Sequence, residues 1–188
     1  MSKSNIFIIS GPSGVGEDSV IEGLRKYLEI ERVITTTTRQ MRPGEISGKP
    51  YYFISKKEFA NRISNGEVAE YAQEYNDNFY GVTKNELNRV ATSDRIGIWK
   101  IEYKGVMTAK KKFPEMKSIY IAAPSLEILR RRIIRRNPTV SKEYLEERMA
   151  YTIEWMKHEN IYDYKVINEE GKLDATIKKV VEIIKKNI

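Results

Sequence analysis

The sequence predicts an α/β fold in which helices cover a mostly parallel sheet. Short β-rich segments alternate with longer helical ones along the 188 residues, and this alternation is typical of parallel-sheet folds. The segment Ile6–Ser10 is apolar on both faces, as expected for a strand buried inside such a sheet. Near the end of the chain, apolar residues follow the helical spacing i, i+3, i+4, i+7 at Ile177, Val180, Val181 and Ile184.

The other core elements continue this alternation. The residues at positions 33–38 are mostly β-branched, which favours a strand there. We expect further strands at Val33–Thr38, Ile96–Ile101, Ser118–Ala122 and Lys165–Ile167, and helices at Val20–Leu28, Leu126–Arg135 and Lys142–Asn160.

Two stretches interrupt the alternation. Residues 39–90 hold short β-like segments at Tyr51–Ile54 and Val68–Tyr71 with glycines at the bends, which predicts a small antiparallel insert. Residues 136–142 break a helical stretch around Asn137 and Pro138 and predict a mobile loop. The expected organisation is one domain, with a core of residues 1–38, 91–135 and 143–188, an insert of residues 39–90 and a lid at about residues 136–142.

Composition excludes several classes of function. The chain has no cysteine, which excludes disulfides and thiolate chemistry, and its single histidine, His158, excludes a multi-histidine metal site within one chain. No apolar run approaches the ~20 residues that span a bilayer. The first residues lack the features of a secretory signal, so we expect a cytoplasmic protein with no membrane partner. The formal net charge of +7 favours anionic partners such as nucleotides.

A glycine-rich loop follows the first predicted strand and precedes a predicted helix. Gly11 and Gly16 have the spacing of the phosphate-binding pattern G-x-x-x-x-G-K-[ST], in which backbone N–H groups and a helix N-terminus attract an anion. Glu17 stands in place of the lysine, and Asp18 follows it where a hydroxyl is common. Two carboxylates repel an anion unless a cation intervenes. The loop is therefore either an altered phosphate site or a degenerate one, in which Asp18 and Ser19 only cap the helix.

Several further motifs occur in a fixed order along the chain. They are Gly11-Pro12-Ser13-Gly14, Thr37-Thr38-Arg39, Arg42-Pro43-Gly44-Glu45, Gly48-Lys49-Pro50-Tyr51-Tyr52-Phe53 and Phe79-Tyr80-Gly81. Together they resemble the guanylate kinase family, which includes the guanylate-kinase-homology domains of scaffold proteins, over nearly the whole chain. The resemblance implies a P-loop nucleoside-monophosphate kinase fold. This fold has a five-stranded parallel core with helices on both faces, a small mixed insert that binds the monophosphate, and a lid.

The resemblance also implies an acceptor site for GMP. Arg39 and Arg42 resemble the arginines that grip the monophosphate, for which a guanidinium fork is well suited. Tyr51 and Tyr80 resemble the tyrosines that complete this grip, and Glu70 resembles the carboxylate that accepts from guanine. Three further candidates near the base are Thr35, where serine is usual, Glu102, where aspartate is usual, and Thr83, because Val82 replaces a family hydroxyl.

A donor site for ATP is implied in the same way. Arg132, Arg136 and Arg148 resemble the arginines in and beside the lid that surround the transferring phosphoryl group. Asn168 resembles the asparagine beside the adenine. The candidates for phosphate binding in the loop are Gly11, Ser13, Gly14, Val15, Gly16, Glu17, Asp18 and Ser19.

Lys100 occupies a position that is normally aspartate in the family. The loop has lost a lysine and the strand has gained one, and the C-terminal ends of both strands are expected at one site. Lys100 would then replace the loop lysine as a catalytic residue, while Glu17, Asp18 and Ser19 help to hold Mg²⁺. The alternative is a Lys100–Glu17 salt bridge that fills an abandoned ATP site. In both cases we expect the two positions to be coupled.

The predicted function is Mg²⁺- and ATP-dependent phosphoryl transfer to GMP or dGMP, giving GDP and ADP, by a monomer or homodimer. The alternative is a catalytically impaired module of the same fold that binds GMP or a phosphorylated partner. A third hypothesis, nucleic-acid binding, rests on the net charge and the arginine-rich stretch 130–136. No recognised nucleic-acid motif accompanies that charge, so nucleic acid is not expected as a partner.

Overall fold

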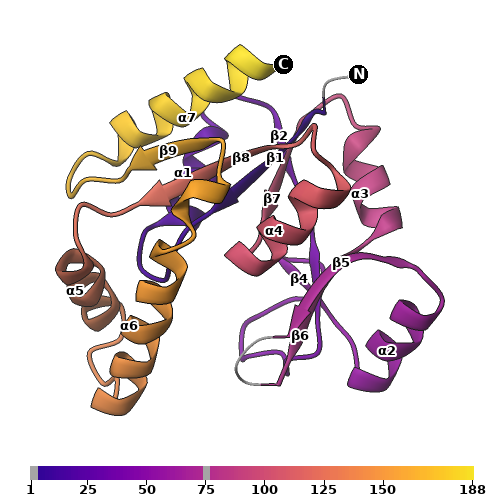
Figure 1. The fold of residues 1–188 in the computed structure, drawn as a ribbon, viewed down its shortest axis with the longest axis horizontal. Coiled ribbons are helices and arrows are strands. Elements are labelled where there is room, and N and C mark those ends of the chain that lie inside the picture. The colour runs from indigo at the N-terminus through magenta and orange to yellow at the C-terminus, as the bar shows by residue number, and fades with distance from the viewer. Residues whose placement is uncertain (1–3, 74–76) are drawn as a thin grey trace.

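Five parallel strands form the central sheet in the computed structural model, which describes residues 4–73 and 77–188. The sheet order is β2-β7-β1-β8-β9 (Figure 1). The strands are β1 (Ile6–Ser10), β2 (Ile30–Arg32), β7 (Ile96–Lys100), β8 (Lys117–Ala122) and β9 (Tyr164–Ile167). Every residue of the central strand β1 is buried, which confirms the prediction of a parallel α/β core.

Helices cover both faces of this sheet. Successive side chains of a strand point to opposite faces, so Phe7 and Ile9 pack in the cluster under α1 (Glu17–Leu24) and α7 (Leu173–Asn187). Ile6 and Ile8 pack on the other face, under α3 and α4. The remaining helices are α2 (Lys56–Ser64), α3 (Lys84–Ala91), α4 (Tyr103–Lys112), α5 (Leu126–Arg136), α6 (Lys142–Met156) and the short 3₁₀ helix η1 (Glu159–Ile161). In the described part of the chain, no helix combines the length and the apolar character needed to cross a membrane.

A second, four-stranded sheet forms the insert, with the order β4-β3-β6-β5. Its strands are β3 (Thr35–Thr37), β4 (Tyr51–Phe53), β5 (Val68–Gln73) and β6 (Phe79–Thr83). The β3–β6 and β5–β6 pairs are antiparallel as the turns suggested, but β3 and β4 are parallel. The insert sheet is therefore mixed.

One expected strand is in fact two. The stretch Val33–Thr38 was predicted as a core strand, yet the structure places β2 at Ile30–Arg32 in the core and β3 at Thr35–Thr37 in the insert. The Val33 amide still donates to the Ile98 carbonyl of the core at 2.9 Å. The chain passes from the core sheet to the insert sheet between Arg32 and Thr35, in a β-like stretch of sequence that contains no turn signal.

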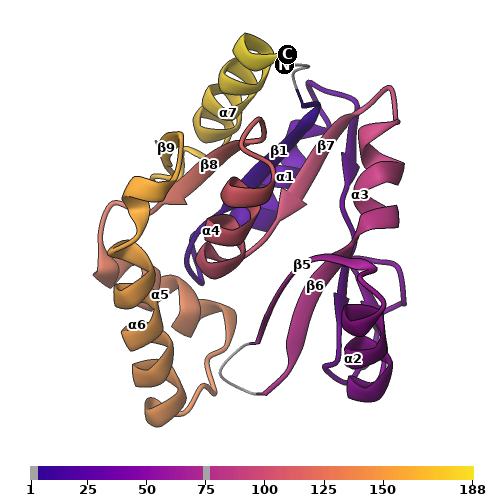
Figure 2. The ribbon, with the colours of Figure 1, turned by 45° about the vertical axis from the view of Figure 1, so that its right-hand side comes forward.

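Helices α5 and α6 form a pair that projects beside the insert (Figure 2). Their connection lies at residues 137–141, because α5 ends at Arg136 and α6 begins at Lys142 with Ser141 as its cap. α6 ends at Met156, earlier than the predicted Asn160, and η1 follows it. α1 begins at Glu17 rather than Val20, so the helix starts directly behind the glycine-rich loop.

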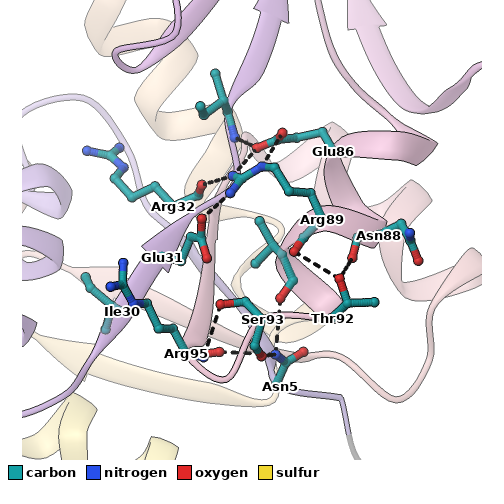
Figure 3. Close-up of polar contacts among 12 residues, drawn as sticks. Asn5, Ile30, Glu31, Arg32, Glu86, Asn88, Arg89, Thr92, Ser93 and Arg95 are labelled. Atoms are coloured by element: carbon teal, nitrogen blue, oxygen red, sulfur yellow. Dashed lines mark hydrogen bonds and ion pairs between the residues drawn. The ribbon is translucent and has the colours of Figure 1, made fainter.

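Hydrogen bonds and ion pairs join the two chain segments that connect the core to the insert, namely the β2–β3 connection and helix α3 (Figure 3). The Glu86 carboxylate of α3 accepts from the Ile34 amide at 2.7 Å. It also accepts from Arg89 Nε at 2.9 Å and Nη2 at 2.8 Å. Arg89 in turn donates to the Arg32 carbonyl at 3.2 Å and pairs with Glu31. We call this group, Glu31, Glu86, Arg89 and the Ile34 amide, the hinge clamp.

Candidate active site

A cleft of about 900 Å³ lies between the carboxyl ends of the core strands, the insert and the α5–α6 pair. Its lining contains every predicted site residue except Val15 and Thr83. The predicted residues that line it are Gly11, Ser13, Gly14, Gly16, Glu17, Asp18, Ser19, Thr35, Arg39, Arg42, Tyr51, Glu70, Tyr80, Lys100, Glu102, Arg132, Arg136, Arg148 and Asn168. Residues of the core, insert and lid, far apart in the sequence, therefore meet at one site.

Two glycines of the loop occupy positions that admit no other residue without strain. A side chain at Gly11 would lie 2.4 Å from the Ile121 carbonyl of the neighbouring strand β8. Gly16 has a φ of 94°, a conformation that favours glycine. Both glycines are thus required by local geometry, and the departures at Glu17 and Asp18 concern side chains only.

Two residues predicted for the ATP site, Asn168 and Arg132, form hydrogen bonds with the backbone of the loop. Val15 is buried, and its carbonyl accepts from Asn168 Nδ2 at 2.8 Å and from Arg132 Nη1 at 3.3 Å. Asn168 Oδ1 accepts from the Thr176 hydroxyl at 3.2 Å, which fixes the amide orientation. Val15 therefore takes part through its backbone, and Asn168 and Arg132 shape the loop as well as line the cleft.

Lys100 contacts the loop directly, and its partner is Asp18 rather than Glu17. Lys100 Nζ lies 2.7 Å from Asp18 Oδ2, and Arg32 Nη2 lies 3.1 Å from Asp18 Oδ1. Burial alone would raise the pKa of Asp18, but Lys100 and Arg32 outweigh it and lower the pKa. Burial alone would lower the pKa of Lys100, but Glu17 and Asp18 raise it. The pair is therefore a carboxylate and an ammonium ion at neutral pH.

Glu17 lies near the Lys100–Asp18 pair. Among the described residues, Glu17 forms no ion pair with Lys100. Burial raises the pKa of Glu17 to about 8, with Asp18 and Glu102 adding to the rise and Lys100 opposing it. At neutral pH the Glu17 carboxyl is thus largely protonated. A neutral carboxyl removes most of the repulsion toward phosphate that the sequence suggested.

Arg39 is fixed in the cleft by a residue to which sequence reasoning gave no role. Glu45 accepts from Arg39 Nη1 at 2.9 Å and Nη2 at 2.8 Å, and from the Arg42 amide at 2.7 Å. The guanidinium also lies 5.6 Å from the Tyr51 ring centre and 5.2 Å from that of Phe53. The bond to Arg39 lowers the pKa of Glu45 to about 2. The only sequence signal was the place of Glu45 at the end of the Arg42-Pro43-Gly44-Glu45 motif.

Two further carboxyl groups, those of Glu70 and Glu102, line the cleft. Glu70 is only 3% exposed. Its burial raises the pKa to about 7, with Glu102 adding to the rise and Lys112 opposing it. Glu102 accepts a hydrogen bond from the Tyr151 hydroxyl of α6. Tyr151 also lines the cleft, and no motif in the sequence pointed to it.

The lid arginines reach the cleft from both helices of the α5–α6 pair. Arg148 of α6 donates from Nε to the Tyr144 hydroxyl at 2.9 Å, and its guanidinium lies 5.2 Å from the centre of that ring. Arg136 is exposed at the end of α5 and lines the same cleft. Positive charges from both helices therefore line the cleft, and Arg132 contacts the glycine-rich loop.

The structure places Thr83 outside the cleft lining. Its hydroxyl accepts from the Glu86 amide at 3.2 Å and caps α3. Val82 is buried in the core cluster. Thr83 therefore does not restore the hydroxyl that Val82 replaces, whereas Thr35 does line the cleft.

Comparison with known proteins points to one family. The family model described as guanylate kinase matches residues 3–187. A guanylate kinase of Buchnera aphidicola subsp. Baizongia pistaciae is 39% identical over 176 residues, which are 92% of this chain and 84% of that protein. A guanylate kinase of Lactiplantibacillus plantarum is 38% identical over 182 residues, which are 93% of this chain and 85% of that protein.

Solved structures agree with these relatives. A crystal structure of guanylate kinase from Anaplasma phagocytophilum has a TM-score of 0.76 and 28% identity, over 99% of this chain and 87% of that one. Shikimate kinase from Acinetobacter baumannii shares the fold alone, with a TM-score of 0.52 and 12% identity over 99% of this chain and 95% of that one. From the ordered motifs, the two-sheet architecture, the shared cleft and these comparisons, we conclude that the chain belongs to the guanylate kinase family.

Proposed function

We propose that this protein transfers the γ-phosphoryl group of ATP to GMP or dGMP, and that Lys100 takes the part of the missing loop lysine. The observation that carries the proposal is the single cleft that joins a phosphate-loop backbone to a cationic insert and to lid arginines. Neither half of the site needs a covalent intermediate, because phosphoryl transfer depends on alignment and charge stabilisation.

The insert supplies the acceptor half of the site. Arg39, Arg42, Tyr51 and Tyr80 line one wall of the cleft and offer the donors that a phosphate dianion requires. Because Glu45 holds the Arg39 guanidinium, this arginine is ordered before the substrate arrives, and the entropy cost of binding is reduced.

Glu70 supplies base recognition in this scheme. An ionised carboxylate accepts hydrogen bonds, and the N1–H and amino groups of guanine are two adjacent donors. Among the described residues, no donor forms a hydrogen bond with the Glu70 carboxylate, while its burial disfavours the charged form. Guanine would thus satisfy a buried acceptor, and adenine, which presents no donor at N1, would not.

Lys100 supplies positive charge to the donor half. It reaches the loop from the carboxyl end of β7, which pairs with β1 at Ile9. ATP phosphates would compete with Asp18 for the ammonium group, and the lid arginines would stabilise the charge that develops on the transferring phosphoryl group. Closure of the α5–α6 pair over the insert would exclude water from the reaction.

Once Glu17 gives up its proton, Glu17, Asp18 and Ser19 would fit a Mg²⁺ ion that arrives with ATP, because metal ligands bind in their deprotonated form. They offer oxygen donors, the ligand type that Mg²⁺ prefers, and this ion is commonly held by one or two carboxylates together with phosphate oxygens. Within the described residues, no three acidic or histidine side chains form a metal site on their own. When bound, Mg²⁺ would neutralise charge on the phosphates.

A coupled assay of ADP release tests the proposal with GMP, dGMP, AMP, UMP and CMP, each with and without Mg²⁺. Release of ADP that requires Mg²⁺ and is fastest with GMP or dGMP would support transfer. The second candidate is a module that binds GMP without transferring phosphate, which the Lys100–Asp18 ion pair across the loop favours. GMP binding with no ATP–Mg²⁺ binding would select this candidate. A cytoplasmic location and a monomeric or homodimeric state stay predictions.

A further inference from the structure

Helix α6 carries three residues of the cleft, Arg148, Tyr151 and Trp155, at successive helical turns. Arg148 and Tyr151 are three positions apart, so they share a helix face, and both line the cleft. The Tyr151 hydroxyl donates to Glu102 Oε2. Glu102 follows β7 and is the first residue of the turn into α4. A residue of the lid helix is therefore bonded to a carboxylate on the base side of the site.

The C-terminal end of α6 is fixed to the ends of the core strands by a second series of contacts. Trp155 Nε1 donates to the Tyr162 hydroxyl at 3.1 Å, and that hydroxyl lies 2.9 Å from Ser10 Oγ. Ser10 donates to the Ile101 carbonyl at 2.6 Å. Ile101 directly precedes Glu102 in the sequence, so the helix and the carboxylate are anchored to the same piece of backbone.

The Tyr151 ring is packed as well as hydrogen-bonded. Its centre lies 6.0 Å from that of Tyr103 and 6.0 Å from that of Trp155. This packing restricts the direction in which the hydroxyl points.

Glu102 needs a fixed donor because other carboxyl groups surround it. Its charge contributes to the raised pKa of both Glu17 and Glu70. Without a fixed donor, rotation about its side-chain bonds would move the Glu102 carboxylate away from this position. A donor at Oε2 opposes that movement and leaves Oε1 as an acceptor for a ligand.

We propose that Tyr151 is a positioning residue for base selection: it holds Glu102 so that Oε1 accepts from the exocyclic amino group of a guanine. This inference rests on the proposed function of the cleft. Arg148 lies one turn from Tyr151 on the same helix. A base that binds Glu102 would therefore also restrict the position of Arg148 beside the phosphoryl group, through the Glu102–Tyr151 hydrogen bond. Selection of the base would then appear in kcat as well as in KM.

The experiment compares GMP with IMP, which lacks only the exocyclic amino group. Tyr151→Phe removes the hydroxyl and keeps the ring. We expect kcat/KM for GMP to fall about tenfold, the size expected for one hydrogen bond to a charged group, while kcat/KM for IMP changes by less than about twofold. The kcat with GMP should move toward the kcat with IMP.

Tyr164→Phe is the matched control. It also removes one tyrosine hydroxyl, which here donates to Asn187 Oδ1 at 3.1 Å between β9 and α7, away from the cleft. Its GMP to IMP ratio should equal that of the unaltered protein. In a Glu102→Ala background, Tyr151→Phe should no longer change the ratio, because the group that it positions is absent.

Three results would overturn the inference. Equal losses for GMP and IMP would show that Tyr151 only supports α6, and an unchanged ratio would show that its hydroxyl has no part in base selection. If the unaltered protein does not distinguish GMP from IMP, Glu102 does not read the amino group. Should no phosphoryl transfer occur at all, the proposed function fails separately, and calorimetric affinities for GMP and IMP decide the inference by the same ratio.

Discussion

Lys100 and Asp18 form an ion pair at the glycine-rich loop, with 2.7 Å between Nζ and Oδ2. The pair joins the carboxyl end of β7 to the first turn of α1. An ammonium group is thus present beside the loop although position 17 carries none. This ammonium group comes from the end of a core strand and not from the loop or the helix that follows it.

Removing this ammonium group should separate transfer from acceptor binding. We expect Lys100→Ala to lower kcat at least about 10²-fold, the usual cost of losing a group that stabilises transition-state charge. GMP affinity should stay within about twofold, because the acceptor residues lie in the insert. Coupled kinetics and calorimetry measure the two quantities. A Lys100→Ala protein with unchanged kcat would remove Lys100 from the machinery.

Restoring the family arrangement should recover what the single change loses. The double variant Glu17→Lys with Lys100→Asp places the ammonium group on the loop and the carboxylate on the strand. We expect its activity to exceed that of Lys100→Ala, and Glu17→Lys alone to bring no gain, because it crowds two ammonium groups together. The coupling between the two positions should exceed about 1 kcal/mol in a double-mutant cycle. If Glu17→Lys alone gave a faster kinase, the hypothesis that Lys100 replaces the loop lysine would be wrong.

Loss of an acceptor arginine should weaken GMP binding. Arg42→Ala should reduce the binding free energy of GMP by about 1.5–3 kcal/mol, the scale of a charged hydrogen bond. Arg62→Ala is the control, since Arg62 lies on α2 of the same insert and pairs with Glu58 outside the cleft lining. Calorimetry with equal GMP affinities in both variants would remove Arg42 from the acceptor site.

Base discrimination should be weaker than in relatives that have a hydroxyl at position 82. Val82 is buried and Thr83 caps α3, so neither offers a hydroxyl to the base. One missing partner typically costs about 1–3 kcal/mol, which predicts a narrower gap between GMP and AMP. Competition binding measures this gap. A preference for GMP of several orders of magnitude would show that another group replaces the contact.

The ligand-free protein should become less stable as the pH rises through the range in which Glu70 ionises. Burial raises the pKa of Glu70 from its ordinary value of 4.5 to about 7. Between these values the native state holds more protons than the unfolded state, so the free energy of unfolding falls with rising pH and levels off above the native pKa. Glu70→Gln should remove this part of the fall and stabilise the protein at about pH 8 by about 1–3 kcal/mol.

Urea unfolding at about pH 5 and about pH 8 checks this expectation. The unaltered protein also contains Glu17, whose pKa is raised in the same direction, so the informative quantity is the difference between the two proteins. If the two proteins lose the same stability between these pH values, Glu70 is not protonated in the native state.

The sequence predicted the parallel core well because the central strand β1 is apolar on both faces and the last helix, α7, has a clear helical period. It could not show that the chain changes sheets between Arg32 and Thr35, since β-branched residues suit either sheet. The motifs indicated many residues of the cleft, but they gave no role to Glu45 and did not point to Tyr151. These two act on Arg39 and Glu102, and such contacts depend on tertiary packing rather than on spacing along the chain.

The hinge clamp gives the molecule a natural reporter of insert movement. The Ile34 amide donates to the carboxylate of Glu86, which is buried, so its exchange with deuterium requires that bond to open. An insert that rotates as one body about the clamp would leave this amide slow to exchange whether or not GMP is bound. If the insert moves by breaking the hinge clamp, each opening would expose the Ile34 amide to solvent. The deuterium exchange rate of this amide would then report how often the insert opens.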